Sequence, residues 1–342
     1  MTNHYDLAML GFGNVGRALA RLLVAKQEFI RLRHAVTFRV VGIYTQRHGC
    51  ALDPEGIELL RAVRLVERGQ TLSELTQLAE PPDALAFLRT CGANLLMEST
   101  PVNYETGQPA LDYLKTALEI GMHAISANKG PVVHGYEELT GLAEARQLRF
   151  LFESAVMDGA PIFSLWRETL PGAVLTGFRG ILNSTTNYIL TRMEAGESYA
   201  EALAHAQQIG IAETDPSGDV QGWDAAVKVA ALVTVLMGRA CTPAQVEREG
   251  IASVTPERIR QAKAAGQRWK LICSAGWEGN VLTTRVAPEP IDSGDPLFNV
   301  SGTSSALTFF TDVLPALTVI EGNPGPETTA FGMLADFLRV VR

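Results

Sequence analysis

Apolar positions in the first 149 residues follow two alternating patterns. Short, nearly continuous apolar runs are separated by stretches in which apolar residues recur every three or four positions. Runs of the first kind are typical of buried strands, and stretches of the second kind are typical of amphipathic helices. The expected strands are Tyr5–Leu10, Val36–Tyr44, Asn94–Met97 and His123–Ser126. The first expected helix follows Gly16, and the others cover Ile57–Arg68, Thr71–Ala79, Ala110–Ile120 and Tyr136–Arg146. This alternation predicts an α/β fold with a parallel, doubly wound sheet of the Rossmann type.

The pattern changes after Arg149, where strand-like segments no longer alternate with helices. The expected strands are Phe150–Glu153, Val174–Leu182, Leu271–Ser274, Leu282–Val286, Leu307–Thr311 and Leu317–Ile320, and the expected helices are Tyr188–Met193, Ala200–Ile209 and Trp223–Met237. We therefore expect a first domain over residues 1–148 and a second, mixed α+β domain over residues 149–321. The C-terminal segment 322–342 contains an amphipathic helix, Thr328–Val341, which we expect to pack back on the first domain.

Composition narrows the class of protein. The 342 residues are 46% hydrophobic and 19% charged, and the net charge is −8 without a basic stripe, which argues against nucleic-acid binding. The apolar run Val229–Met237 is far shorter than the ~20 residues that span a bilayer, so we expect no membrane association. The N-terminus has no signal-peptide pattern, and four scattered cysteines without a C-x-x-C pair indicate free thiols in a reducing, cytoplasmic setting.

A glycine-rich turn joins the first expected strand to the first expected helix. In GFGNVG, the first glycine permits a tight turn, the second lets a pyrophosphate approach and the third allows close helix–strand packing. The phosphate is then expected at the helix N-terminus. The predicted dinucleotide-binding residues of this turn are Gly11, Phe12, Gly13, Asn14, Val15 and Gly16.

The end of the second expected strand bears on the choice between NAD and NADP. No carboxylate stands in Ile43–His48, where a ribose 2′-hydroxyl would need one, whereas Arg47 and His48 follow directly. An arginine at this place suits a 2′-phosphate, so the sequence favours NADP over NAD. An ordinary loop arginine is the alternative.

Lys129 follows a strand end in SANKGP, at the sheet edge where ligands bind in such folds. We interpret Gly130-Pro131 as a stop, which leaves Lys129 in a loop and predicts a contact with the substrate or the nicotinamide. A surface lysine is the alternative. A second segment that contains glycine and proline, Glu153–Ile162, is expected to form a loop. Its oxygens would suit a hard monovalent cation, and a plain turn is the alternative.

Four carboxylates lie within twelve residues of the second domain, at Glu213, Asp215, Asp219 and Asp224, and Lys228 follows one helical turn after Asp224. Carboxylates so close together repel unless positive charge sits among them, for which Lys228 and a substrate ammonium group are candidates. In the alternative, Asp219 is a helix N-cap and Asp224–Lys228 an i,i+4 surface pair worth about 0.3–0.5 kcal/mol. The helix is apolar nearly all round, which predicts burial and favours a functional lysine.

Taken together, these motifs resemble the homoserine dehydrogenase family over nearly the whole chain. The segments that carry the resemblance occur in the family's order: GFGNVG, the EST-P segment at Glu98–Pro101, SANKGP, the ESAV…P loop, GILNSTTNYIL at Gly180–Leu190 and AETDPSGDVQGWDAAVK. The resemblance implies an enzyme that interconverts L-homoserine and L-aspartate 4-semialdehyde with NAD(P)H, in threonine and methionine biosynthesis. It also implies a homodimer built on the second domain. The chain ends soon after the last helix, so we expect no C-terminal regulatory domain.

The resemblance further implies roles for individual residues. It makes Lys228, Lys129 and Asp224 catalytic, and Glu213, Asp219 and Thr185 substrate-binding. Thr100 and Lys129 join the glycine turn and Arg47 as cofactor contacts. A sodium site is implied at Glu153, Val156, Asp158 and Ala160.

Two departures from the family pattern leave alternatives open. Met157-Asp158 replaces the glycines that usually follow the valine, so main-chain ligands would best survive in the cation loop. Ser184 stands where glycine is common and would narrow the pocket, which leaves another small amino-acid or hydroxy-acid aldehyde as an alternative substrate. A non-catalytic dinucleotide sensor is the other alternative, although a sensor has no need for a proton-transfer lysine.

Overall fold

The computed structural model describes residues 3–342, which divide into two compact units. The first unit consists of the chain up to Gly159 together with Gly325–Arg342, and the second of Ala160–Pro324. The chain passes from the first unit to the second after Gly159, later than the expected boundary between residues 148 and 149. The reason is that the sixth strand of the first sheet and the short helix after it belong to the first unit.

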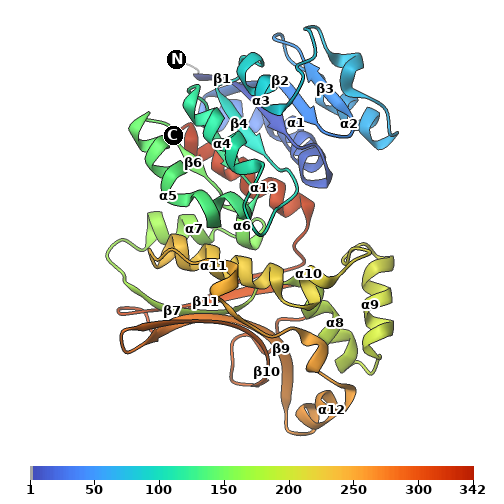
Figure 1. Cartoon of the computed structure of the whole chain (residues 1–342), viewed down its shortest axis with the longest axis vertical. Coiled ribbons are helices and arrows are strands. Elements are labelled where there is room, and N and C mark those ends of the chain that lie inside the picture. The colour runs from blue at the N-terminus through green and yellow to red at the C-terminus, as the bar shows by residue number, and fades with distance from the viewer. Residues whose placement is uncertain (1–2) are drawn as a thin grey trace. The chain divides into compact units, whose positions relative to one another are not determined.

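The first unit contains a six-stranded sheet with helices on both faces, as predicted for a Rossmann-type fold (Figure 1). Its elements are β1 Asn3–Leu10, α1 Asn14–His34, β2 Val36–Thr45, β3 Gly49–Leu52, α2 Leu59–Glu67, the 3₁₀ turn Leu72–Leu75, α3 Ala84–Thr90, β4 Leu95–Glu98, α4 Ala110–Glu119, β5 His123–Ser126, α5 Lys129–Ala145, β6 Phe150–Leu151, α6 Ser154–Met157 and α13 Pro326–Val340.

The strand order in this sheet is β3-β2-β1-β4-β5-β6. Strands β2, β1, β4, β5 and β6 are parallel, and β3 is added antiparallel to the edge of β2. The chain leaves β1 toward β2 and later returns to place β4 on the other side of β1. This reversal is the point at which ligands bind in doubly wound sheets.

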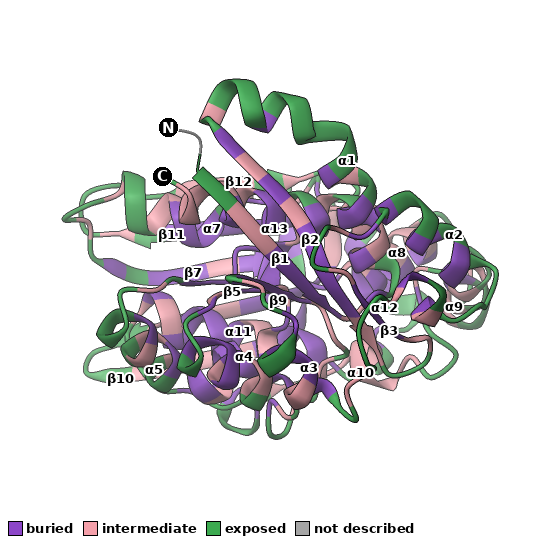
Figure 2. Ribbon diagram, turned by 90° about the horizontal axis from the view of Figure 1, so that it is seen from above, coloured by how far each residue is buried: buried purple, intermediate pink, exposed green. Residues whose placement is uncertain are grey.

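Helices cover both faces of the sheet (Figure 2), and the apolar core cluster lies between the strands and the layer formed by α1, α2 and α13. Helices α1, α2 and α13 pack on one face, and α3, α4 and α5 pack together on the other. Helix α13 contacts α1 along its length and buries Met333 and Phe337 in the core of the first unit.

Several expectations for this unit were wrong. The helix expected over Thr71–Ala79 is only the 3₁₀ turn Leu72–Leu75, since Thr76 leaves the helical conformation. Helix α5 begins at Lys129, not at Tyr136, because Asn128 caps it and Pro131 lies in the first turn, where a missing N–H costs nothing. Strand β6 ends at Leu151, and the expected loop after Glu153 begins as the helical turn α6. Strand β3 and helix α3 were not expected, since each is short and lies in a stretch without clear periodicity.

The second unit is a mixed α+β fold, as predicted. Its elements are α7 Ile162–Ser164, a π-helical turn Leu165–Thr169, β7 Leu175–Ile181, α8 Ser184–Glu194, α9 Tyr199–Gln208, α10 Ser217–Val220, α11 Trp223–Leu236, a 3₁₀ turn Pro243–Gln245, β8 Glu247–Arg248, a 3₁₀ turn Ile251–Ser253, α12 Pro256–Ala264, β9 Gln267–Glu278, β10 Val281–Asp292, β11 Ser305–Thr311 and β12 Leu317–Glu321.

Its sheet has the order β12-β11-β7-β9-β10-β8, antiparallel except for the short pairing of β8 with β10. Helices α8 and α11 pack on one face of this sheet (Figure 1). Helix α11 is buried nearly all round, as its apolar sequence predicts. Helix α12 was not expected, because only Ile259 and Ala262 of its residues are buried.

None of the helices in residues 3–342 combines the length and apolar character that a membrane crossing requires. The four cysteines are free and buried. Burial raises the pKa of Cys50 and of Cys273 to about 12, so neither thiol is an activated nucleophile.

Candidate active site

The glycine turn after β1 meets three different steric demands. Gly11 has φ +91° and lies so close to the next loop that a Cβ there would be 2.6 Å from the Ser99 carbonyl oxygen. A Cβ on Gly16 would lie 2.6 Å from the Gly11 carbonyl oxygen, so this glycine permits the close approach of α1 to the turn. Gly13 faces open space. This is the arrangement that a bound pyrophosphate requires: two glycines for the backbone and one for the ligand.

The N-terminus of α1 is open to an anion. Gly13 is its N-cap and provides no side-chain hydrogen bond, and the first turn contains no acidic residue. Asn14 is exposed, and its Oδ1 accepts a hydrogen bond of 2.8 Å from Arg17, which brings a positive charge to this turn. Backbone N–H groups, helix dipole and guanidinium together suit phosphate oxygens. Phe12 is buried, and Val15 packs against the core.

Arg47 lies in the turn between β2 and β3, beyond the carboxyl end of β2. The Tyr44 carbonyl oxygen accepts a hydrogen bond of 3.0 Å from Gly11 N–H, so the end of β2 adjoins the glycine turn. The Arg47 side chain is exposed. The arrangement leaves it accessible at the edge where the cofactor ribose is predicted.

The loop after β4 is organised by a buried carboxylate. Glu98 ends β4, and its Oε1 accepts hydrogen bonds from Thr100 N–H at 2.7 Å and from Thr100 Oγ1 at 2.5 Å. Its Oε2 accepts one from Ser126 Oγ at 2.5 Å. Thr100 therefore lies at the strand edge beside the glycine turn, where a cofactor contact was predicted.

Lys129 is the first residue of α5 and is partly exposed. Asn128 caps this helix through Gly130 N–H and donates to the Thr100 carbonyl oxygen at 3.2 Å. The Lys129 Nζ lies 6.0 Å from the centre of the Tyr104 ring. The fold thus brings Thr100 and Lys129 to one edge of the first sheet.

The segment predicted to hold a cation is bonded to α13. Arg339 Nη1 donates to Glu153 Oε2 and to Asp336 Oδ1, each at 2.8 Å, and Asp336 Oδ2 accepts from Glu153 N–H at 2.7 Å. Burial raises the pKa of Asp336 to about 7, and the Glu153 carboxylate adds to this rise. Two buried carboxylates therefore share one guanidinium.

The side chains of this segment fit a cation poorly. Asp158 Oδ1 accepts a hydrogen bond from Thr329, and the Ala160 carbonyl oxygen accepts one of 2.8 Å from Ile162 N–H. Val156 is buried in α6. Within residues 3–342, His, Cys, Asp and Glu side chains do not gather in groups of three that suit a metal ion. Ligands for sodium would have to be main-chain oxygens.

In the second unit, Asn183 joins two of the predicted carboxylates. Its Nδ2 donates to Asp219 Oδ1 at 2.7 Å and to Asp224 Oδ2 at 3.0 Å. Its Oδ1 caps α8 by accepting from Thr186 N–H at 2.8 Å, which fixes the amide. Both protons of the Asn183 amide therefore form hydrogen bonds to carboxylates, one to Asp219 and one to Asp224, and orient them.

Lys228 lies one turn after Asp224 on α11, and its Nζ is 3.2 Å from Asp224 Oδ2. The same Nζ donates to the Leu182 carbonyl oxygen at 2.6 Å. The side chains of Lys228 and Asp224 are only 14% and 10% exposed, so the pair is not the surface pair of the alternative interpretation. Asp219 is not a helix N-cap either, since Gly222 precedes α11.

The electrostatics of this cluster favour a cationic ligand. Burial raises the pKa of the Asp219 carboxyl above its usual value, and the Asp224 carboxylate raises it further. Asn183, Thr185 and Lys228 act in the opposite direction. Two carboxylates and one ammonium leave one negative charge in a partly buried place, which a substrate ammonium group would balance.

The other predicted residues of this unit lie around the cluster. Thr185 is buried in the first turn of α8, and its Oγ1 donates to the Ile211 carbonyl oxygen at 3.2 Å. Ser184 is the first, partly exposed residue of the same helix. Glu213 is exposed on the segment between α9 and α10, and its carbonyl oxygen accepts from Gln207. The structure thus gathers Thr185, Asp219, Asp224 and Lys228 and leaves the Glu213 side chain toward solvent.

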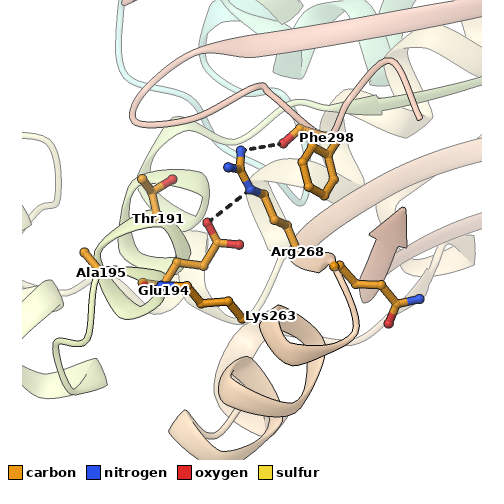
Figure 3. A pocket seen from close by; sticks show the side chains of 8 residues that line it. Thr191, Glu194, Ala195, Lys263, Arg268 and Phe298 are labelled. Atoms are coloured by element: carbon orange, nitrogen blue, oxygen red, sulfur yellow. Dashed lines mark hydrogen bonds and ion pairs between the residues drawn. The ribbon is translucent and has the colours of Figure 1, made fainter. Parts of the chain in front are cut away.

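A pocket of about 360 Å³ lies at the opposite, C-terminal end of α8 (Figure 3). It is lined by Thr191, Glu194, Ala195, Lys263, Arg268 and Phe298, among others. Burial raises the pKa of Glu194, while Lys270, Arg268 and Lys263 oppose the rise. None of the sequence-predicted site residues lines this pocket, so it is separate from the acid cluster.

Three residues that hold the predicted ones in place were not predicted from the sequence: Glu98, Ser126 and Asn183. Each was part of a recognised motif, but its role depends on contacts with residues distant in sequence. Asn183 had a local indication, because an asparagine before a helical run is a good N-cap.

Comparisons with known proteins agree along the whole chain. The family model "Homoserine dehydrogenase, NAD binding domain" matches residues 11–153, and the model "Homoserine dehydrogenase" matches residues 161–338. The NAD(+)-dependent homoserine dehydrogenase of Pseudomonas canavaninivorans is 34% identical over 339 residues, covering 98% of this chain and 96% of that protein.

Solved structures show the same likeness. A putative homoserine dehydrogenase from Archaeoglobus fulgidus superposes with a TM-score of 0.87 at 29% identity, covering 98% of this chain and 99% of the other. A hyperthermophilic archaeal homoserine dehydrogenase in complex with NADPH gives 0.83 at 28% identity, covering 98% and 97%. These matches do not favour a different aldehyde substrate or a non-catalytic sensor. The chain belongs to the homoserine dehydrogenase family of NAD(P)-dependent oxidoreductases.

Proposed function

We propose that this chain interconverts L-homoserine and L-aspartate 4-semialdehyde with Lys228 as the proton-transferring group. The observation that carries the proposal is the nearly buried Asp219–Asn183–Asp224–Lys228 network. Its geometry gives the ammonium group two acceptors, Asp224 Oδ2 and the Leu182 carbonyl oxygen. An ammonium has three protons, so a third remains for a substrate oxygen.

The chemistry requires a proton at the carbinol oxygen. In the reductive direction, the aldehyde carbon would receive its hydride from a bound reduced nicotinamide. The oxygen that gains negative charge takes a proton from Lys228, and in the oxidative direction the neutral amine takes the proton back. Asp224 acts as a catalytic partner, because its carboxylate stabilises and orients the ammonium form.

Substrate binding follows from charge. The excess negative charge of Asp219 and Asp224 suits the substrate ammonium, and we include Glu213 as a further contact to it and Thr185 as a hydroxyl contact. Lys129 would meet the substrate carboxylate or the reacting oxygen. The support for Lys129 is its place at the sheet edge that also carries Thr100.

For the cofactor, we propose that Gly11–Gly16 and the start of α1 hold the pyrophosphate, and that Arg47 favours NADPH over NADH. The relatives differ on this point, since one is named as NAD(+)-dependent and another was solved with NADPH. Support for NADPH comes from the exposed Arg47 and the absence of a carboxylate in residues 43–48. A 2′-phosphate would gain a charge-assisted contact there.

A monovalent cation remains part of the proposal only as a ligand of main-chain oxygens near Glu153, Val156, Asp158 and Ala160. The Glu153 carboxylate is already bonded to the Arg339 guanidinium, so the proposed ligands do not include this side chain. Activity in sodium chloride and in tetramethylammonium chloride of equal ionic strength tests this. A rise confined to sodium supports the site.

We also propose a homodimer formed through the face of the second sheet opposite α11. Phe310 and Ile320, from paired strands, point to this face and are 37% and 58% exposed. Exposed apolar side chains on adjacent strands mark an association surface. Light scattering after gel filtration should give twice the chain mass, and Ile320→Lys should shift the mass toward that of one chain.

The buried free thiols support a reducing, cytoplasmic setting for the enzyme. Fluorescence microscopy of cells in which the chain carries a fluorescent tag would locate it directly.

The deciding experiment is NADPH oxidation with L-aspartate 4-semialdehyde. We expect turnover with this substrate and at least tenfold lower kcat/KM, roughly 1.4 kcal/mol, with an analogue that lacks the ammonium group. Activity that is equal with both substrates would contradict the role of the acid cluster. If NADPH is not oxidised under any condition, the proposed catalytic function of these residues is contradicted.

A further inference from the structure

Glu98 is a fully buried carboxylate that the proposed reaction does not use. It ends β4, at the carboxyl edge of the first sheet, and its side chain is shielded from solvent. Burial of a carboxylate carries a large desolvation penalty unless hydrogen bonds offset it. A residue with this cost and no part in the chemistry needs another explanation.

The hydrogen bonds of Glu98 join two loops. Oε1 accepts from the backbone and hydroxyl of Thr100, in the loop after β4, at 2.7 and 2.5 Å. Oε2 accepts from Ser126 Oγ, at the end of β5, at 2.5 Å. One carboxylate thereby fixes the ends of two neighbouring strands.

From Ser126 the connection continues to α5. Ser126 Oγ accepts a hydrogen bond of 3.0 Å from Asn128 N–H, and Asn128 Oδ1 accepts one of 3.0 Å from Gly130 N–H. Asn128 Nδ2 returns to the Thr100 and Pro101 carbonyl oxygens at 3.2 and 3.4 Å. The ring of bonds closes on Thr100, and Lys129 lies inside it in sequence, between Asn128 and Gly130.

We propose that Glu98 is a positioning residue, which holds Thr100 and Lys129 in one fixed arrangement at the edge of the first sheet. The consequence for catalysis rests on the proposed function, because it needs Lys129 and Thr100 to contact substrate or cofactor. The consequence for the loops does not. Displacement of a group by about 1 Å can cost roughly 10²-fold in rate, so loss of the carboxylate should act mainly on kcat.

The first test compares Glu98→Ala with Glu98→Gln. Alanine removes all three hydrogen bonds, and we expect kcat to fall by roughly 10²-fold, while the KM for homoserine changes by less than about threefold. Glutamine retains an oxygen for Thr100 and an amide that bonds Ser126 Oγ, so it should restore kcat to within about tenfold of the parent. A kcat for Glu98→Ala within threefold of the parent overturns the proposal.

The second test is hydrogen exchange, which does not depend on activity. Glu98→Ala should speed exchange in residues 99–104 and 127–135 together, and Leu88→Ala serves as the control. Leu88 is a core residue of α3, which carries no site residue, so its cavity lowers stability without touching the ring of bonds. Unchanged protection of both segments in Glu98→Ala overturns the positioning role, whatever the kinetics show.

A third variant covers the case in which Glu98→Ala does not fold. Ser126→Ala keeps the Glu98 carboxylate and its bonds to Thr100, but removes the hydroxyl that connects this carboxylate to Asn128. It should lower kcat by about tenfold and speed hydrogen exchange in residues 127–135 but not in 99–104. Parental kcat and exchange for this variant contradict the proposal. Lys129→Met separates the two ideas: if it retains full kcat, the catalytic role of Lys129 fails, and the exchange result still decides whether Glu98 positions the loops.

Discussion

The candidate site residues fall into two halves, one in each unit, and the two halves differ in kind. In the first unit, the glycine turn offers backbone: N–H groups at a helix start without a side-chain cap, and three glycines, at two of which a Cβ would collide with backbone oxygens. In the second unit, the candidate residues act through side chains: one asparagine bridges two carboxylates, and one of these carboxylates pairs with a lysine.

This difference bears on how each half tolerates change. A backbone site persists as long as the fold does, and fails when a substitution adds atoms. A side-chain site fails when a substitution removes a charge or a donor, even though the fold remains. The following variants test that distinction.

The largest effect is expected for Lys228→Met. Methionine has a similar volume but no proton, so kcat should fall by about 10²–10⁴-fold, while dinucleotide affinity, set in the other unit, should stay near the parental value. Steady-state kinetics and a fluorescence titration with NADPH measure the two. Lys263→Met, at the pocket beyond the end of α8, is the control and should be nearly neutral. A kcat within a few-fold of the parent would reduce Lys228 to an ion-pair partner and make Lys129 the leading candidate.

Gly13→Ala should damage cofactor binding without damaging the fold. The added methyl group enters open space in the protein, at φ −73°, but it occupies the expected place of the pyrophosphate. A steric cost of about 1–3 kcal/mol corresponds to about 5- to 150-fold weaker NADPH binding. Thermal unfolding should be unchanged.

Gly16→Ala provides the contrast, because its methyl group would meet the Gly11 carbonyl oxygen at 2.6 Å. We expect this variant to lose stability, seen as a lower Tm. If Gly13→Ala unfolds as readily as Gly16→Ala, the division of roles between the two glycines is wrong.

Glu213→Gln should have an intermediate effect. If the exposed carboxylate meets the substrate ammonium, its loss removes one charge-assisted hydrogen bond of about 1.5–3 kcal/mol, and the KM for homoserine should rise by at least about tenfold with little change in kcat. Asp215→Asn is the matched control, since Asp215 is also exposed but its Oδ1 accepts a hydrogen bond from Ser217 N–H. Equal KM values for the two variants would remove Glu213 from the site.

The smallest effect is expected for Arg47→Ala. An exposed contact to a 2′-phosphate is worth on the order of 1 kcal/mol, so the KM for NADPH should rise by about fivefold while that for NADH is unchanged. Arg33→Ala, at the opposite end of α1, should change neither. Equal effects of Arg47→Ala on both cofactors would contradict the predicted NADPH preference.

The backbone half was the easier one to predict from sequence. The spacing of Gly11, Gly13 and Gly16 between a strand and a helix encodes a local geometry, and no distant residue is needed to define it. In the same way, the apolar runs identified β1, β2, β4 and β5 to within a few residues. Local signals failed where two rules competed, as at Lys129, where the cap at Asn128 prevails over the apparent Gly-Pro stop.

The side-chain half was only partly predictable. The four-residue spacing of Asp224 and Lys228 predicts a shared helix face, and the 3.2 Å ion pair confirms it. The hydrogen bond from Asn183 to Asp219 joins residues 36 positions apart, and the bond to Asp224 joins residues 41 positions apart. Local sequence patterns extend over far fewer residues, so they could not predict these bonds. The same reason hid the connection of Glu153 to Arg339, which spans 186 positions.

Helix α13 gives the chain an unusual order of assembly during synthesis. The second unit is one continuous segment and can fold once Pro324 has left the ribosome, whereas the first unit still lacks a helix of its core at that moment. Met333 and Phe337 must then pack against strands made some three hundred residues earlier. Domains usually fold in the order of synthesis, the N-terminal one first, but here the N-terminal unit is the last to be completed. Until α13 has been made, the aromatic side chains that pack against Phe337, those of Tyr5 and Phe38, lack this cover.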